Sequence, residues 1–123
     1  GVARSSMRPV YKDGQFVQPD DSAFQSAAAG ADWKNAPGFG AILTDQPGKA
    51  SWPITGATFI LMHKKQDKPE NAAIALKFFD WAYEAGDKLA LDLDYVPMPD
   101  SVVKLVKAEW KKIQDPAGKP VAY

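Results

Sequence analysis

The segment from Pro69 to Gly86 constrains this chain most, because it predicts a helix that is apolar around most of its circumference. Proline suits the first turn of a helix, and glycine commonly ends one. The polar residues beyond the first turn, Lys77, Asp80 and Glu84, fall on one narrow stripe. Such a helix needs packing partners on two sides, so we expect a sheet on one side and another helix on the other.

The residues before this helix, Ile54 to His63, predict a β-strand. Residues 59–62 read Phe-Ile-Leu-Met, which is continuously apolar rather than alternating. This pattern is typical of a strand covered on both faces. Such strands usually belong to parallel or mixed sheets flanked by helices, so the sequence predicts an α/β fold.

Shorter patterns predict the other elements. Residues 10–17 predict a hairpin around Lys-Asp-Gly-Gln, and residues 19–30 predict a helix onto which Trp33 folds back. Proline and glycine interrupt residues 34–50, which predicts irregular structure there. Residues 87–94 stay open between a strand, favoured by alternating leucines, and a short helix.

The last predicted helix begins near Pro99-Asp100-Ser101. Helical spacing places four apolar residues on its buried face: Val103, Val106, Trp110 and Ile113. Three lysines are predicted to lie outside: Lys104, Lys107 and Lys111. Spacing also predicts that Trp81 and Trp110 pack in the core, whereas Trp33 and Trp52 have no periodic context.

Composition narrows the function. The 123 residues suffice for one domain, and 15 Lys and Arg balance 15 Asp and Glu. This balance argues against a polybasic nucleic-acid binder, an acidic tail or a basic membrane-surface helix. The absence of cysteine excludes disulfides and Cys-ligated zinc. The longest stretch without a charged residue, 50–63, is too short to cross a bilayer and is broken by Pro53 and Gly56.

The residues supply no catalytic or metal-binding set. His63 is the single histidine and stands at the end of the predicted strand, which favours a surface position over proton transfer. Asp92, Asp94 and Asp100 lack the spacing of a calcium loop and are interpreted as solvated carboxylates. Residues 38–40 (Gly-Phe-Gly) lack the third glycine of a dinucleotide-binding loop. We therefore predict an α/β domain that is not an enzyme and uses no metal or cofactor.

Several motifs occur in an order and at intervals that resemble one known family. They are Ala31-Asp32-Trp33, Trp52-Pro53-Ile54-Thr55, Thr58 to Lys64, Leu76 to Tyr83, Leu93-Asp94-Tyr95, Pro99 to Val103, and Gly118-Lys119-Pro120. From about Asp13 onward the chain resembles the C-terminal part of the periplasmic phosphate-binding protein of the Pst phosphate ABC transporter. Trp-Pro-Ile-Thr followed by Lys-Phe-Phe-Asp-Trp-Ala-Tyr is the most specific part of this resemblance.

This resemblance implies that the chain is the C-terminal segment of a two-lobed periplasmic binding protein fold of type II. Residues 1–50 would form part of the second lobe, residues 51–58 the hinge crossing, and residues 59–123 the C-terminal part of the first lobe. The resemblance also favours a short helix for residues 87–94.

The implied function is capture of inorganic phosphate in the periplasm and its delivery to a membrane ABC permease. The family's phosphate ligands lie upstream of this chain, so none is carried onto it, and Thr55 and Thr58 are left as candidates for the border of the cleft. We expect the N-terminal remainder of the same protein as a partner, no nucleic acid, and no phosphate-selective binding by the chain alone. The alternative is a stand-alone structural or interaction domain that derives from this fold without ligand binding. A phosphate-ester hydrolase fits worse, because neither a nucleophile–base pair nor a metal set is available.

Overall fold

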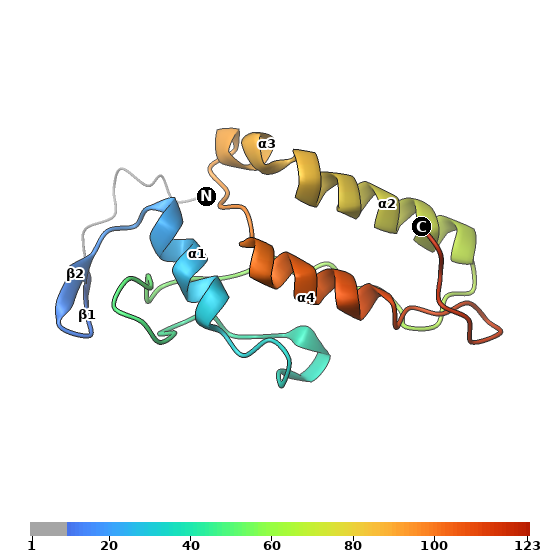
Figure 1. Cartoon of the computed structure of the whole chain (residues 1–123), viewed down its shortest axis with the longest axis horizontal. Coiled ribbons are helices and arrows are strands. Elements are labelled where there is room, and N and C mark those ends of the chain that lie inside the picture. Colours follow the sequence, from blue (N-terminus) through green and yellow to red (C-terminus); the bar gives the residue numbers. More distant parts are fainter. Residues whose placement is uncertain (1–9) are drawn as a thin grey trace.

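The computed structural model describes residues 10–123, which form two short strands and several helices joined by long irregular segments (Figure 1). Any assignment of residues 1–9 to a lobe lies outside the described residues. The elements are, in chain order, β1 (Val10–Lys12), β2 (Gln15–Val17), α1 (Asp21–Gly30), the 3-10 turn η2 (Pro37–Phe39), α2 (Pro69–Ala85), α3 (Asp87–Asp92) and α4 (Asp100–Trp110).

The N-terminal elements confirm the predicted hairpin and helix. β1 and β2 pair antiparallel, and the turn residues Asp13 and Gly14 both have positive φ, as the common two-residue hairpin turns require. Asp20 caps α1, because its Oδ1 accepts a hydrogen bond of 2.8 Å from the Ala23 N–H. Trp33 folds back as expected, and its Nε1 donates to the Ala28 carbonyl at 2.7 Å.

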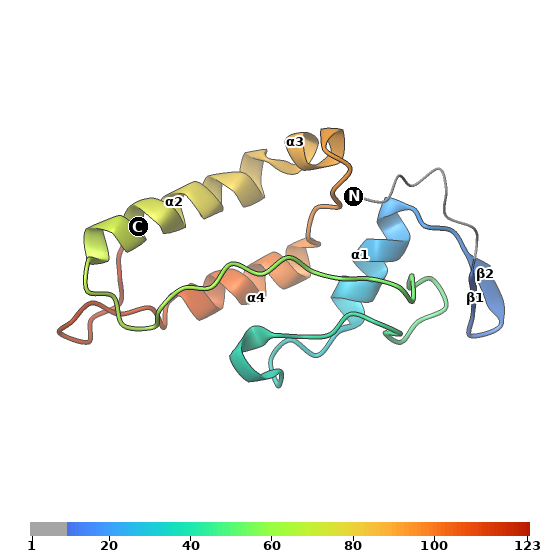
Figure 2. The same cartoon turned by 180° about the vertical axis from the view of Figure 1, so that it is seen from behind.

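The predicted strand at residues 54–63 is wrong for this structure. The segment runs extended across α4 (Figure 2), and Ala57 packs against the buried cluster that contains Val102. Yet no backbone group of residues 54–63 hydrogen bonds to another backbone group within the described chain. A strand exists only through its ladder partner, and residues 10–123 supply none here. The sheet expected from the sequence is therefore reduced to the β1–β2 hairpin in the described residues.

The C-terminal helices follow the predicted boundaries closely. α2 starts at Pro69 and is followed by Gly86, whose N–H donates to the Ala82 carbonyl at 3.0 Å. Residues 87–92 form the short helix α3, which resolves the open choice in favour of a helix. α2 and α4 lie side by side (Figures 1 and 2), and their contacts include the ion pairs of Lys107.

Lys107 corrects the prediction that all three lysines of α4 lie outside. Its Nζ lies 2.6 Å from Asp80 Oδ1 and 3.1 Å from Glu84 Oε1, both on α2. The hydrogen bond to Asp80, followed by that to Glu84, raises the pKa of Lys107 above its usual 10.5. The polar stripe of α2 thus meets a cation on α4, while Lys104 and Lys111 remain exposed as predicted.

The core consists of three apolar clusters. One joins α2, α4 and the C-terminal segment through Leu76, Trp110 and Val121, and Tyr123 packs edge-on against Trp110. A second joins Trp33 and Leu43 to α4, where Val102 is the most deeply buried residue rather than the predicted Val103. The third packs Trp52 against β2 and α1, through Val17 and Ala23. Trp33 and Trp52, which have no periodic context in the sequence, are therefore core residues.

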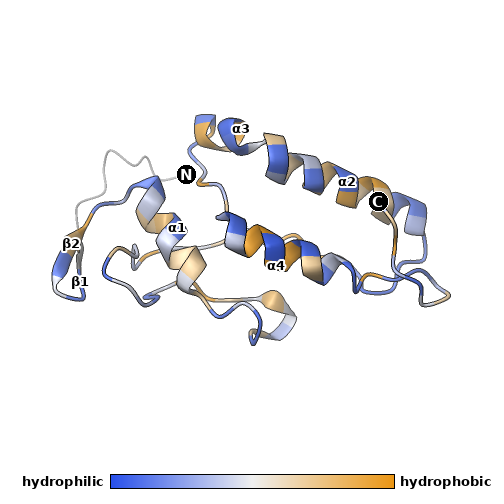
Figure 3. Ribbon diagram, viewed as in Figure 1, coloured by the Kyte–Doolittle hydropathy of each residue, from blue (hydrophilic) through white to orange (hydrophobic). Residues whose placement is uncertain are grey.

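The outer side of α2 departs furthest from expectation. Ile74, Phe78 and Trp81 lie at helical spacing on one face and are 67%, 59% and 49% exposed. Trp81 is therefore not the core residue that its spacing predicted, whereas Trp110 is 8% exposed as expected. Apolar residues occur along both α2 and α4 (Figure 3). The partner expected on the second side of α2 is not among residues 10–123.

Candidate functional site

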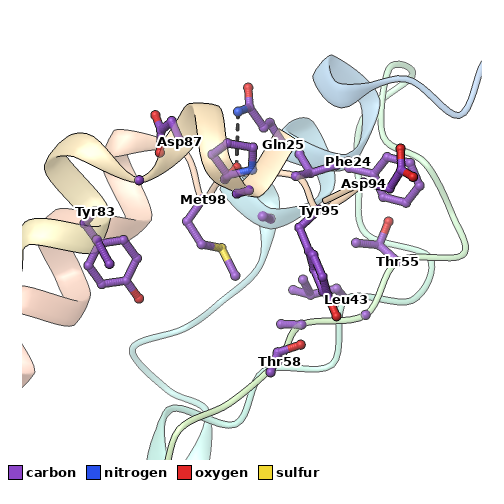
Figure 4. A pocket seen from close by; sticks show the side chains of 18 residues that line it. Phe24, Gln25, Leu43, Thr55, Thr58, Tyr83, Asp87, Asp94, Tyr95 and Met98 are labelled. Atoms are coloured by element: carbon purple, nitrogen blue, oxygen red, sulfur yellow. Dashed lines mark hydrogen bonds between the residues drawn. The ribbon is translucent and has the colours of Figure 1, made fainter. Parts of the chain in front are cut away.

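A cavity of about 450 Å³ lies where residues 55–58 pass α1 and the segment that links α2 to α4 (Figure 4). Phe24 and Gln25 of α1 line one side, and Tyr95 and Met98 line another. The Gln25 Nε2 donates to the Pro97 carbonyl at 3.2 Å, which ties α1 to the 94–98 segment. Leu43 also lines the cavity, so four stretches of chain that are remote in sequence meet there.

The cleft candidates Thr55 and Thr58 both line this cavity (Figure 4). The Thr55 hydroxyl donates to the Trp52 carbonyl at 2.8 Å, which fixes the local turn after Trp-Pro. This donor is therefore already engaged within the chain. Thr58 is exposed, and its side chain has no hydrogen bond within the described residues. The structure brings the two threonines to one cavity without forming a ligand set from them.

The charged groups at the cavity do not suit an anion. Asp87 and Asp94 line it, and none of its lining residues is Lys, Arg or His. Phosphate sites instead place cations, hydroxyls or free backbone N–H groups against the oxygens. Two carboxylates repel a dianion by Coulomb's law, and the described residues that line the cavity include no cation to offset them. The described lining of the cavity therefore does not have the composition of a phosphate site.

Sequence reasoning did not assign Gln25, Asp94 or Tyr95 to this cavity, although Asp94 and Tyr95 belong to the motif Leu93-Asp94-Tyr95. The assignment was missed because the cavity forms only when separate segments pack together. Asp94 has φ 61°, a conformation that Asp adopts more readily than most residues. The local signals available were its place just after α3 and its membership of the motif Leu93-Asp94-Tyr95.

A second groove follows the other part of the extended segment. Residues 57–62 form one wall, and Trp33, Phe39 and Val106 contribute to the other sides of a space of about 570 Å³. Trp33 stacks on Phe39 with ring centroids 5.6 Å apart and lies 6.3 Å from the Phe59 ring. Charged side chains also line this groove, namely Lys34, Lys64, Lys112 and Glu109.

The remaining candidates behave as surface residues. His63 is exposed, as predicted. Asp92 pairs with Lys88 at 2.9 Å on the surface of α3, and Asp94 and Asp100 are exposed. In residues 10–123 no group of three His, Cys, Asp or Glu side chains could hold a metal ion. Among the described helices, none has the length and apolar character needed to cross a membrane.

Comparison with known proteins relates this chain to one class. The phosphate-binding protein PstS of Pasteurella multocida is 50% identical over 100 residues, which are 81% of this chain and 29% of that protein. PstS of Haemophilus influenzae is 50% identical over 98 residues, covering 80% of this chain and 29% of that protein. PstS of Xylella fastidiosa is 44% identical over 97 residues, covering 79% and 27%. No known family profile matches the chain.

These similarities make the chain a relative of phosphate-binding proteins. More specifically, it is homologous to the C-terminal part of PstS, which confirms the resemblance found in the sequence. The chain spans less than a third of the length of these relatives.

Proposed function

We propose that this chain is the C-terminal part of a periplasmic solute-binding protein, one that captures inorganic phosphate and delivers it to a membrane ABC permease. The observation that carries this proposal is the 50% identity over 100 residues to phosphate-binding proteins. Within the proposal, residues 1–50 belong to the second lobe, residues 51–58 form the hinge crossing, and residues 59–123 complete the first lobe.

In this proposal the chain supplies lobe packing and the border of the cleft, and the rest of the protein supplies the phosphate ligands. Two observations support that division. Among the described residues, the cavity beside Thr55 and Thr58 is lined by Asp87 and Asp94 and by no Lys, Arg or His. The Thr55 hydroxyl is also engaged with the Trp52 carbonyl.

The uncovered surfaces support a packing partner from the same protein. The outer face of α2, formed by Ile74, Phe78 and Trp81, is about half or more exposed. Residues 54–63 leave their backbone groups without backbone partners in the described chain. Large exposed apolar surfaces are unusual on a self-sufficient domain and mark interaction sites. The N-terminal remainder of a protein as long as the relatives would be the natural source of that partner.

The alternative function is a stand-alone structural or interaction domain without ligand binding. The three apolar clusters and the well-capped helix α1 favour it, since they are features of a chain that folds by itself. The two functions differ in a simple measurement. A stand-alone domain should unfold cooperatively and bind little apolar dye, whereas an incomplete lobe should bind dye strongly.

Phosphate titration tests the proposal that the rest of the protein supplies the phosphate ligands. Isothermal calorimetry of the chain alone should detect no phosphate-selective binding, with sulfate as the matched anion. Micromolar, phosphate-selective binding by the 123-residue chain would show that the ligand set is contained here, contrary to the proposal.

The same titration on the natural protein, together with its intact mass, completes this experiment. Intact-mass measurement on the source material should give a mass well above the 13.4 kDa of this chain. That longer protein should bind phosphate selectively in the same titration. A natural product of 13.4 kDa without phosphate binding would favour the stand-alone domain.

A further inference from the structure

Three segments that are remote in the sequence bring lysines to one end of the molecule. Two backbone hydrogen bonds join the first two segments, because Gln114 N–H donates to the Lys64 carbonyl at 2.7 Å and Gln66 N–H donates to the Gln114 carbonyl at 2.8 Å. The Asp115 N–H donates to the Lys119 carbonyl at 2.8 Å, which adds the third segment. The loops that precede α2 and follow α4 lie side by side in Figures 1 and 2.

Six exposed lysines occupy these segments, and we call them the lysine end. They are Lys64, Lys65 and Lys68 before α2, Lys111 and Lys112 after α4, and Lys119 near the C-terminus. Among the residues that the structure describes, only Lys112 of these six forms an ion pair, with Glu109 at 2.6 Å. The carboxylates of these segments and of the adjoining helix turns are fewer, namely Asp67, Glu70, Glu109 and Asp115. The lysine end therefore carries an excess of positive charge.

The rest of the described chain has the opposite sign. Outside the lysine end, residues 10–123 contain eleven Asp and Glu side chains and seven lysines. The zero net charge of the sequence therefore conceals a separation of charge between this end and the remainder. An anionic surface attracts the lysine end and repels the remainder, so it orients the molecule as well as binding it.

We propose that the lysine end docks this chain on an anionic phospholipid surface. Clusters of four to eight basic side chains are typical of sites that bind anionic lipid headgroups. The contact needs no membrane-spanning segment, since charge attraction acts at the headgroups. It is a partner beyond the proposed function, and it does not depend on phosphate binding.

The type of basic residue favours lipid over an acidic protein surface. Residues 10–123 contain no arginine, so every ammonium group of the lysine end belongs to lysine. The planar guanidinium of arginine suits carboxylates held in a fixed geometry, as on a folded partner. Lysine carries a point charge on a flexible stem, which suits mobile headgroups that offer no fixed geometry.

The chain offers two matched sets of lysines to test this proposal. The first variant combines K65Q, K111Q and K119Q, which removes one lysine from each segment of the lysine end. The control variant combines K49Q, K77Q and K104Q, at exposed lysines elsewhere that form no ion pair with described residues. Both variants lose three positive charges, so they have the same net charge and differ only in where the charge is lost.

Co-sedimentation of the 123-residue chain with vesicles measures the contact. At about 0.1 M salt the chain should bind mixed phosphatidylglycerol and phosphatidylcholine vesicles more tightly than pure phosphatidylcholine vesicles. The first variant should weaken binding to the mixed vesicles at least about tenfold, and the control variant should leave it within about threefold. At about 1 M salt the chain should be released, because the screening length falls from about 10 Å to about 3 Å. Circular dichroism of both variants checks that the helices remain.

The other outcomes overturn the proposal. Absence of binding, or equal binding to both kinds of vesicle, would show that charge does not hold the chain on lipid. Equal weakening by the two variants would attribute binding to net charge and not to the lysine end. Tighter binding to soluble polyglutamate than to the mixed vesicles, lost in the first variant, would assign this end to an acidic protein instead.

Inorganic phosphate separates the lipid surface from a discrete anion site. Phosphate and chloride at equal ionic strength should displace the chain from the mixed vesicles equally, since both act by screening. Stronger displacement by phosphate would indicate a discrete phosphate site at the lysines and reject the membrane contact. Calorimetric phosphate titration of the natural protein tests the proposed function separately.

Discussion

Helices α2 and α4 lie side by side, yet their surroundings differ. α4 is amphipathic, and its apolar residues Val102 and Trp110 are buried while Lys104 is exposed. α2 buries Ala72 and Leu76 on one side and exposes Ile74, Phe78 and Trp81 on the other. The apolar face of α4 is therefore covered by other parts of the chain, whereas only one of the two apolar sides of α2 is covered. The spacing of apolar residues predicts how many faces of a helix need a packing partner, and only the tertiary structure shows which of these faces have one.

The strongest test of this comparison uses the two tryptophans. Trp110→Ala should destabilise the chain by about 3–5 kcal/mol, because Trp110 is buried against Tyr83 and Tyr123. Trp81→Ala should cost less than about 1 kcal/mol, since that ring is half exposed. Urea unfolding measures the loss of stability in both variants. Equal losses for the two variants would mean that the outer face of α2 is covered in solution.

The two sides of α2 itself give the second test. Leu76 is fully buried, so Leu76→Ala should destabilise by about 2–5 kcal/mol. Ile74→Ala, two residues away on the exposed face, should change stability by less than about 0.5 kcal/mol. Urea midpoints of the two variants, at equal protein concentration, measure the difference. A large loss of stability for Ile74→Ala would contradict the assignment of faces.

The ion pairs between the helices give the smallest effect. The pKa of Lys107 is raised by its hydrogen bonds to Asp80 and Glu84, so the folded chain holds this proton more tightly than the unfolded chain does. The resulting stability is complete below pH about 10.5 and is lost as the pH rises through the higher folded-state value. From about pH 9 to about pH 11.5 the urea midpoint of Lys107→Met should fall less than that of the unsubstituted chain.

Lys104→Met is the matched control for this test, because Lys104 is an exposed lysine of the same helix. Its midpoint should follow that of the unsubstituted chain. Burial raises the pKa of Tyr83, which lowers stability over the same alkaline range. Tyr83 is present in all three chains, so the difference between the two lysine variants isolates the ion pairs. Identical pH profiles for those variants would exclude a contribution from them.

Local patterns predicted the helices well and the sheet poorly. Pro69 and Gly86 bracket α2, and Asp20 with Gly30 brackets α1, since capping and termination depend on residues adjacent in sequence. The strand at residues 54–63 failed for the opposite reason. Its partners must come from elsewhere, and strand propensity alone does not form a ladder.

In the candidate site, too, some residues could be predicted from the sequence and others could not. Thr55 and Thr58 were identified from their place near the predicted crossing, and they do line one cavity. Asp87 and Asp94, which decide its electrostatic character, could not be assigned to it from the sequence. Their side chains reach the cavity only because α3 turns the chain back toward α1, a consequence of packing between distant segments.

The sequence by itself determined the bounds of α1 and α2, the hairpin turn, the absence of cysteine, and the relationship to phosphate-binding proteins. Each of these depends on residue identity or on spacing within a few turns. The tertiary structure alone decided that Lys107 faces α2, that Trp81 faces outward while Trp110 is buried, and that residues 54–63 remain without a backbone partner. These facts depend on which segments are available to meet, because burial and β-pairing are properties of two surfaces and not of one.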